Sequence, residues 1–215
     1  MLQKIITYLQ AILQAAGYFE KVFPLCVLKE NRTNRDIQPF HYTGNGQLEP
    51  CNDFDHFNGS AYFRKNGDPS LSKYEGALIG TSCSDAVTIK FPLKLVLCIP
   101  RKSLSCDNEY ANDLLAQTLV NLLQAKSTKL RKTLNAYNTA ILVTAYCDDT
   151  FKLLKEEGDS NVTRDINYTL VYMSMNIDVE VIIDKNCIQT ECNISGIIPS
   201  VATALDDMNV ELREG

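Results

Sequence analysis

The residues best suited to metal or acid–base chemistry lie in one short polar segment, which reads Asn-Asp-Phe-Asp-His-Phe-Asn-Gly and contains Asp53, Asp55 and His56. A calcium loop of the EF-hand type needs oxygen ligands at positions 1, 3 and 5 and a glutamate at position 12. Counted from Asp53, position 5 is Phe57 and position 12 is Arg64, so the spacing fails. We therefore expect no functional metal, and we rank an enzyme with an unrecognised site around this segment third among the interpretations.

Other catalytic patterns are absent from the sequence. It has neither a glycine-rich phosphate loop nor a G-x-S-x-G nucleophile elbow. Neither of the two histidines, His41 and His56, stands at a spacing that favours a nucleophile–base pair. The paired acids Asp148-Asp149 and Glu156-Glu157 are explained by helix caps and solvated helix ends. We predict a protein that is not an enzyme and that needs no cofactor.

A cluster of positive charge is the strongest candidate binding surface. Between Leu114 and Cys147 the only charged residues are basic, and they are Lys126, Lys129, Arg131 and Lys132. Such point charges are sufficient for non-specific contact with a nucleic-acid backbone. The alternative is a solvated helix end stabilised by cations near its C-terminus. The net charge of -5 argues against a dedicated nucleic-acid binder.

Charge is divided unevenly along the chain. Residues 1–147 hold 16 Lys and Arg against 12 Asp and Glu, a net charge of +4. Residues 148–215 hold 5 against 14, a net charge of -9. One interpretation is that the two parts form complementary faces between copies of one chain. The other is that the second part is a solvated acidic tail.

The eight cysteines raise the question of the redox compartment. An even count and five Asn-x-Ser/Thr sequons suit a secreted, disulfide-bonded protein. However, the first 16 residues repeat apolar side chains at helical spacing, with glutamines where a signal peptide would be apolar, which predicts an amphipathic helix. We therefore expect a reducing compartment and free thiols. The cysteines are Cys26, Cys51, Cys83, Cys98, Cys106, Cys147, Cys187 and Cys192.

Two long stretches have an apolar residue at every second position, as strands with one buried face do. They are Val87–Ile99 and Thr169–Ile183, in which the odd-numbered residues from Val87 and from Val171 onward are apolar and polar residues fill most of the even positions. Pro92 cannot donate to a ladder, so it should lie at an edge or a bulge. At ~3.3 Å per residue the second stretch spans about 50 Å, which exceeds an ordinary strand. We expect a neighbouring subunit to complete its pairing.

The remaining segments complete an α+β fold, an antiparallel sheet with long strands flanked by helices. We predict one domain over residues 1–184, with a long loop at 29–59, and a C-terminal arm at 185–215. Its further elements are helices at 2–16, 108–125 and 149–157, an extended segment at 18–28 bent or placed at an edge by Pro24, short strands at 60–64 and 74–82, and an apolar segment at 136–146 that fits helix or strand equally.

This order of elements resembles the tail-terminator and tail-completion proteins of bacteriophages and the related neck ring proteins. The resemblance rests on the opening helix Leu2–Ala16, the strand Val87–Ile99, the helix Asn108–Ala125 and the closing strand Thr169–Ile183. The cysteine-containing, asparagine-rich composition also resembles proteins of phages of gut Bacteroidetes, including crAss-like phages.

The resemblance implies a structural virion protein in the neck or upper tail, assembled in the host cytoplasm as a ring of six or twelve copies. Its partners would be portal or adaptor and tail proteins, with double-stranded DNA in the channel as a candidate and no membrane. The basic cluster would then face the channel. Candidate subunit contacts from the long strand and the arm are Val179, Val181, Ile183, Ile197, Ile198 and Leu205. The alternative is a secreted or periplasmic bacterial binding module.

Overall fold

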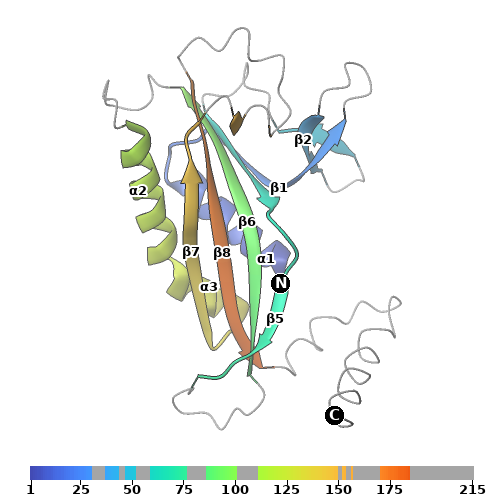
Figure 1. Cartoon of the computed structure of the whole chain (residues 1–215), viewed down its shortest axis with the longest axis vertical. Coiled ribbons are helices and arrows are strands. Elements are labelled where there is room, and N and C mark those ends of the chain that lie inside the picture. Colours follow the sequence, from blue (N-terminus) through green and yellow to red (C-terminus); the bar gives the residue numbers. More distant parts are fainter. Residues whose placement is uncertain are drawn as a thin grey trace.

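A computed structural model describes residues 1–30, 37–43, 47–51, 59–76, 86–100, 111–149, 152–153, 156 and 170–184. These residues form an eight-stranded mixed sheet with three helices, an α+β fold as predicted. Figure 1 shows α1 and α3 behind the long strands and α2 alongside β7. The elements are α1 (Leu2–Ala15), β1 (Lys21–Glu30), β2 (Ile37–Tyr42), β3 (Leu48–Pro50), β4 (Ser60–Lys65), β5 (Ser70–Lys73), β6 (Ala86–Pro100), α2 (Ala111–Ala125), α3 (Ser127–Leu134), β7 (Asn138–Cys147) and β8 (Leu170–Asp184).

The strands follow the order β3-β2-β1-β4-β6-β8-β7, with β5 paired to β6 beyond the end of β4. All pairs are antiparallel except β1–β4, which is parallel, so the sheet is mixed rather than purely antiparallel. β1 is shared: its first half pairs with β4, and from Cys26 onward it pairs with β2. Pro24 falls within the register shift between Val22 and Leu25, so the predicted bend at Pro24 is confirmed.

The main core lies between the long strands and the helices. The odd-numbered residues of β8 from Met173 to Ile183 are at most 2% exposed, which confirms the predicted parity of this strand. Odd-numbered residues of β6 from Phe91 to Ile99 join them. The helices close this layer with Ile5, Ile6, Leu9, Leu13, Leu115, Leu119, Leu123, Leu130 and Leu134.

The expected pairing of β8 with a neighbouring subunit is wrong. β6 is also 15 residues long and pairs with β8 over its whole length, from Ala86↔Asp184 to Pro100↔Leu170. β7 occupies the other side of β8. β8 is therefore paired along its whole length within the subunit, because β6 is equally long and lies beside it. Val179, Val181 and Ile183 face the subunit's own core and are 0%, 0% and 2% exposed, so they offer no surface to a neighbour.

Pro92 lies in the middle of β6, but on one side of it no strand pairs with β6, so it occupies a local edge as predicted. β4 ends opposite Leu93 and β5 begins opposite Lys90, so the ladder on that side is interrupted at Pro92. The amide of Asn66, in the turn between β4 and β5, donates to the Pro92 carbonyl at 3.0 Å. The side of Pro92 that lacks an amide therefore faces a turn and not a strand.

A second, smaller core covers the opposite face of the sheet at one end. It buries the even-numbered residues Val96, Cys98 and Tyr172, which alternation alone places on the solvent side. The remaining members of this core are Phe23, Cys26, Cys51, Tyr62 and Leu153. The hydroxyls of Tyr62 and Tyr172 lie 3.5 Å apart within it. This end of the sheet is therefore buried on both faces.

Several local predictions are corrected or refined. The segment predicted as a long loop at 29–59 contains β2 and β3, which pair with each other. The strand predicted at 74–82 is wrong at its start, because the strand is Ser70–Lys73 and residues 77–85 lie outside the described residues. The ambiguous segment at 136–146 is the strand β7. α1 ends as predicted, with Gly17 at φ +76°, a left-handed conformation that glycine adopts without strain.

Candidate functional site: an uncharged sheet edge and a cationic groove

β7 forms one end of the sheet and exposes an apolar edge. Within the described residues no strand pairs with its outer side. Its sequence, NTAILVTAYC, contains no charged residue and no proline. Leu142 and Tyr146 are 40% and 50% exposed. Natural sheets protect their edges with charges, prolines, bulges or a covering helix, and β7 has the bulge between Val143 and Ala145 and α2 alongside it.

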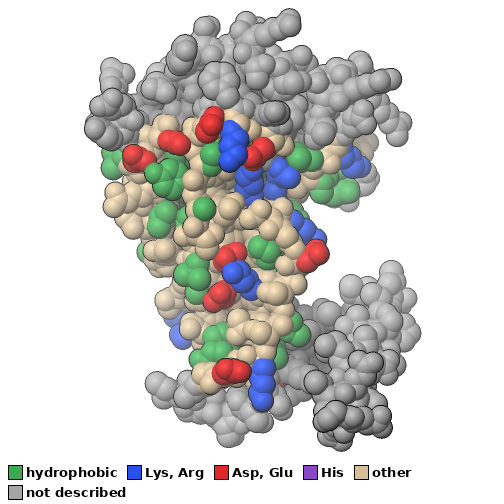
Figure 2. All heavy atoms as spheres, viewed as in Figure 1, with side chains coloured by type: hydrophobic (Ala, Val, Ile, Leu, Met, Phe, Trp, Pro, Cys, Tyr) green, Lys and Arg blue, Asp and Glu red, His purple; other side chains and the backbone are tan. Residues whose placement is uncertain are grey.

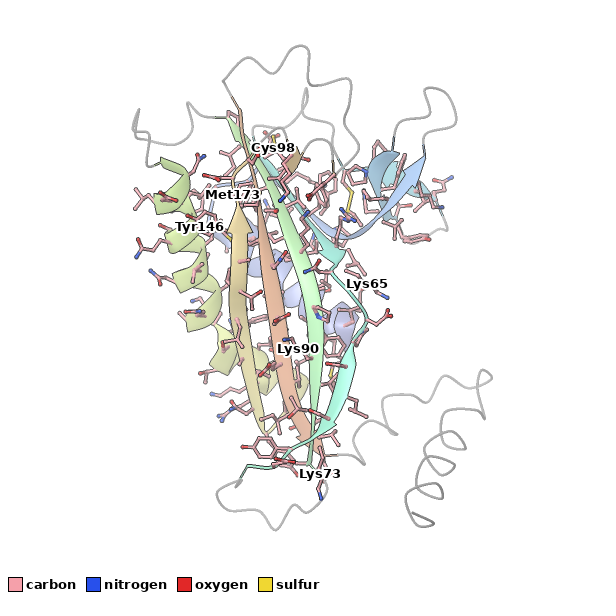
Figure 3. All side chains as sticks on the ribbon, in the orientation of Figure 1. Lys65, Lys73, Lys90, Cys98, Tyr146 and Met173 are labelled. Carbon is pink, nitrogen blue, oxygen red and sulfur yellow. A yellow bond between two sulfur atoms is a disulfide. The ribbon has the colours of Figure 1, made fainter. Side chains whose placement is uncertain are left out.

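The edge strand is held in place from behind by the helices. The Tyr146 hydroxyl donates to Asp113 Oδ1 of α2 at 2.6 Å, and Figure 3 shows Tyr146 at the upper end of β7 beside that helix. This hydrogen bond to a carboxylate raises the pKa of Tyr146. The Thr139 hydroxyl donates to the Ser127 carbonyl at 2.6 Å. β7 is thus fixed in position by α2 and α3, and no strand of the described chain pairs with its outer side.

The opposite end of the sheet differs from β7 in length and chemistry. β3 has three residues and ends in Pro50, which cannot donate a hydrogen bond. Within the β1–β2–β3 lobe, the Cys26–Cys51 disulfide links β1 to the end of β3, and the first half of β1 joins the lobe to the main sheet by pairing with β4. The two ends are therefore not interchangeable, which matters for any assembly that extends the sheet.

A groove lies on the helical side of the molecule, between α1 and the α2–α3 turn. It encloses about 420 Å³ and is lined by Tyr8, Ala11, Ile12, Ala15, Ala16, Leu122, Lys126, Lys129 and Thr133. Small alanines of α1 create the hollow. The Tyr8 hydroxyl donates to the Lys126 carbonyl at 2.9 Å and ties the two walls together. Burial raises the pKa of Tyr8, so this hydroxyl keeps its proton.

The four residues of the predicted basic cluster divide into two pairs on α3. Arg131 and Lys132 lie in the last turn, where cations stabilise a helix, as the solvated-end interpretation expected. Lys126 and Lys129 lie at its start, where the positive end of the helix dipole disfavours them. Within the described chain, none of the four forms an ion pair. Lys126 also follows Ala125, the last residue of α2, where a cation is favoured, so helix stability explains three of the four residues and leaves Lys129 without such an explanation.

The third interpretation, an enzyme around Asp53, Asp55 and His56, falls on residues outside the described part of the chain. Ile197, Ile198 and Leu205 lie outside it as well. Where residues are described, no group of three His, Cys, Asp or Glu side chains is arranged to hold a metal ion. Asp149 accepts a hydrogen bond from the Lys152 amide at 3.0 Å, as the helix-cap explanation of that acid predicted.

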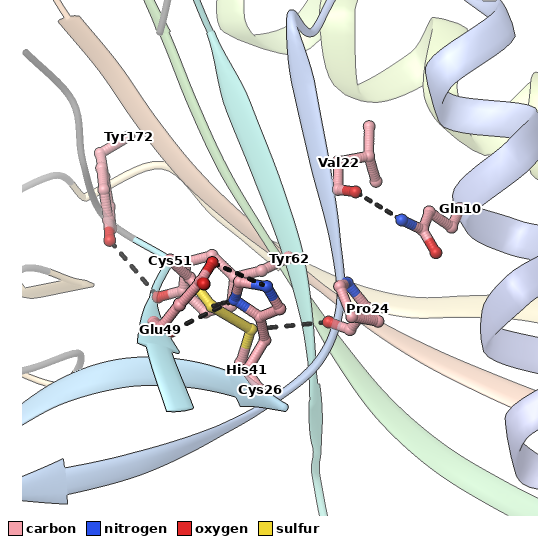
Figure 4. Close-up of a disulfide and its surroundings, with 9 residues drawn as sticks. All are labelled: Gln10, Val22, Pro24, Cys26, His41, Glu49, Cys51, Tyr62 and Tyr172. Atoms are coloured by element: carbon pink, nitrogen blue, oxygen red, sulfur yellow. Dashed lines mark hydrogen bonds and ion pairs between the residues drawn. A yellow bond between two sulfur atoms is a disulfide. The ribbon is translucent and has the colours of Figure 1, made fainter. Parts of the chain in front are cut away.

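The lobe contains a disulfide where free thiols were expected. Cys26 and Cys51 are bonded, which corrects that prediction for these two residues, while Cys98 and Cys147 are thiols. Figure 4 shows His41 beside the disulfide, with Nδ1 3.7 Å from Cys51 Sγ and Nε2 3.9 Å from Glu49 Oε2. This is the order of a cysteine–histidine–acid triad, but the sulfur is bonded and Cys51 is fully buried, so it offers no nucleophile. Sequence spacing missed this cluster because β2 and β3 bring it together.

The face of the long strands away from the helices is polar and carries both signs of charge, as Figure 2 shows. Lys90 Nζ lies 2.7 Å from Asp178 Oδ2 on the neighbouring strand, and this contact raises the pKa of Lys90. Lys94 Nζ lies 3.0 Å from Glu156 Oε2, and the pKa of Glu156 is lowered by that hydrogen bond. This face satisfies its own charges and presents no field of one sign.

None of the helices described here is long and apolar enough to cross a membrane. Comparisons with protein-family models and with curated proteins found no match to this chain.

Proposed function

We propose that the protein is a structural subunit of a bacteriophage virion that assembles as a ring in the neck or upper tail, around the DNA channel. The observation that carries the proposal is the pair of unlike sheet ends. β7 presents an uncharged, exposed edge, and the other end is a short strand closed by Pro50. A contact between two different surfaces repeats from copy to copy, and it closes into a ring when the rotation between copies allows.

Sheet extension is the mode of contact that fits this edge. An added strand gains main-chain hydrogen bonds along β7, and the exposed Leu142 and Tyr146 lose contact with water. Pairing of β7 with the β7 strand of a second copy would instead have two-fold symmetry, so assembly would stop at a dimer. We propose the head-to-tail arrangement, in the copy number of six or twelve that the family resemblance implies, with portal or adaptor and tail proteins above and below.

Contact with DNA would come from the outward cations of α3. Arg131 and Lys132 are exposed and suit non-specific interaction with phosphates. Single-strand stacking is not supported, since the cluster carries no aromatic residue.

Cryo-electron microscopy of virions from the phage that encodes the chain tests this proposal. We expect the chain as a symmetric ring between capsid and tail. Virions that lack the protein by mass spectrometry would contradict the proposal.

A secreted or periplasmic binding module is the second candidate, and the Cys26–Cys51 disulfide favours it. Disulfides persist in oxidising compartments and are rare in the cytoplasm. Peptide mapping without reduction separates the candidates when it is applied to the native protein in the secreted fraction and in virions. A linked Cys26–Cys51 peptide in the secreted fraction, with no protein in virions, would favour this second candidate.

A further inference from the structure

Among the described residues, no acidic side chain lines the groove between α1 and α3, in which Lys126 and Lys129 lie. α1 and α3 contain no acidic residue. Lys129 stands in the first turn of α3, against the helix dipole, and Lys126 is the residue between the end of α2 and the start of α3. An anionic group in the groove would offset both the dipole and the mutual repulsion of the two ammonium groups. The apolar surface beside them, from Ile12 and Leu122, requires that the same occupant be partly apolar.

The segment at 201–214 has this combination of properties. Val201, Leu205, Met208 and Leu212 recur at intervals of four, three and four residues, the spacing that places side chains on one face of a helix. The acids Asp206, Asp207, Glu211 and Glu214 fall outside that stripe, and the only base is Arg213. The sequence therefore has the pattern of an acidic amphipathic helix.

The point where the chain leaves the sheet is close to α3. β8 ends at Asp184, and the Tyr137 hydroxyl donates to Asp184 Oδ2 at 3.2 Å. Tyr137 follows α3 by three residues. α3 has eight residues and is ~12 Å long. The 16 residues at 185–200 reach up to about 50 Å when extended, which is several times that length.

We propose that residues 201–214 dock into the α1–α3 groove of the same chain, with their apolar stripe on Ile12 and Leu122 and their acids near Lys126 and Lys129. A tether of this length gives the segment a local concentration of about millimolar, so the same chain is its favoured partner in dilute solution. The inference rests on charge and spacing and is independent of the proposed ring.

Photocross-linking in the full-length protein tests the docking. Leu205 is replaced by p-benzoylphenylalanine, which keeps the position apolar. Equal amounts of ¹⁴N- and ¹⁵N-labelled protein are mixed before irradiation, so that links within and between chains differ in mass. We expect links within one chain to Tyr8–Ala16 or Lys126–Thr133, with a yield that falls as salt rises.

Charge reversal identifies the interaction that holds the segment. Lys126→Glu with Lys129→Glu should lower the yield about tenfold, because two attractions become repulsions. Reversing the segment as well, with Asp206→Lys, Asp207→Lys and Glu211→Lys, should restore most of it. The control Arg131→Glu with Lys132→Glu lies outside the groove and should leave the yield within about twofold. Circular dichroism confirms that each variant is folded.

Cross-links that map elsewhere on the chain would overturn the proposal. A cross-link yield that does not change when Lys126 and Lys129 are replaced by glutamate would overturn it as well. Links to the groove of the other copy would overturn docking within one chain and would indicate exchange of the segment between subunits. None of these outcomes bears on ring formation, which virion microscopy decides separately.

Discussion

Two regions of one sheet are held together by different forces. One is the slab, which is formed by the long strands β6, β7 and β8 with the helices that cover them, and the other is the β1–β2–β3 lobe. In the slab, β6 and β8 pair over 15 residues and bury one complete face under the helices. In the lobe, β2 and β3 are short, and a disulfide and side-chain contacts around His41 connect them to the rest. The slab therefore depends on the main apolar core, whereas the lobe combines the smaller core, which includes Phe23, Cys26 and Cys51, with the disulfide. Variants that remove one kind of interaction should affect one region and spare the other.

The largest effect should come from a charge on the buried face of the slab. Val179 is fully buried, so Val179→Asp places an unpaired carboxylate in the core and should lower the free energy of unfolding by about 3 kcal/mol or more. Glu180 is the next residue on β8, faces away from the helices and lies opposite Lys90, so the control Glu180→Gln, which places no like charge beside Lys90, should cost under ~0.5 kcal/mol. Urea denaturation of the two variants measures the difference, and equal effects would contradict the parity of β8.

Removing the disulfide should act on the lobe. Cys26 and Cys51 are 25 residues apart, and cross-links of this size stabilise by ~2–4 kcal/mol. In the Cys26→Ser, Cys51→Ser variant, hydrogen exchange of the β1 and β2 amides should accelerate by the factor that corresponds to this loss of free energy. The β6 and β8 amides should stay protected. Equal acceleration in all four strands would show that the lobe and the slab open as one unit.

A glutamine joins the two regions at the start of β1. Gln14 Nε2 donates to the Glu20 carbonyl at 3.1 Å, and the Val22 amide donates to Gln14 Oε1 at 3.1 Å. Gln14→Ala should therefore cost about 1–2 kcal/mol, because it leaves a half-buried amide without its partner. Gln3 is exposed on the same helix, and Gln3→Ala is the matched control, expected to cost under ~0.5 kcal/mol in thermal unfolding.

The smallest effect should depend on pH and involve the polar face of the slab. The pKa of Glu156 lies below its ordinary value of 4.5 because Lys94 hydrogen-bonds the carboxylate. A lowered folded-state pKa contributes stability above the ordinary pKa, and this contribution is lost as the pH falls through the folded-state value. Lys94→Met should therefore destabilise at neutral pH by under ~1 kcal/mol, and less in acid.

Lys73→Met, on an exposed residue of β5, is the control for this pH series. It should show no such change with pH. A Lys94→Met penalty that persists at the most acidic pH would indicate that Lys94 acts through packing of its stem instead.

The sequence predicted the slab well because apolar burial leaves a readable pattern. The parity of β8 follows directly from the alternation between Met173 and Ile183, and the two prolines correctly marked a bend in β1 and a gap beside β6. What alternation does not reveal is the partner strand. The length of β8 suggested a neighbouring subunit, whereas β6 matches it residue for residue.

The lobe and the candidate site were harder to predict. The disulfide depends on β2 and β3 bringing Cys51 to Cys26, which no spacing shows. The sequence identified the four basic residues as one group. Their division along α3 depends on where that helix begins, and Lys126 at its N-cap is not a residue type that marks a helix start. The β7 edge was hidden because an uncharged apolar segment fits a buried helix equally well.

Cross-linking from the β7 edge tests head-to-tail assembly most directly. Leu142 is 40% exposed on that edge and is replaced by p-benzoylphenylalanine in the full-length protein. Irradiation of the concentrated protein and of virions should give a ladder that extends beyond the dimer, with adducts in β2 or β3 of the next copy. Cross-links that join β7 only to β7 and stop at the dimer, or no cross-links between copies in either sample, would contradict the account.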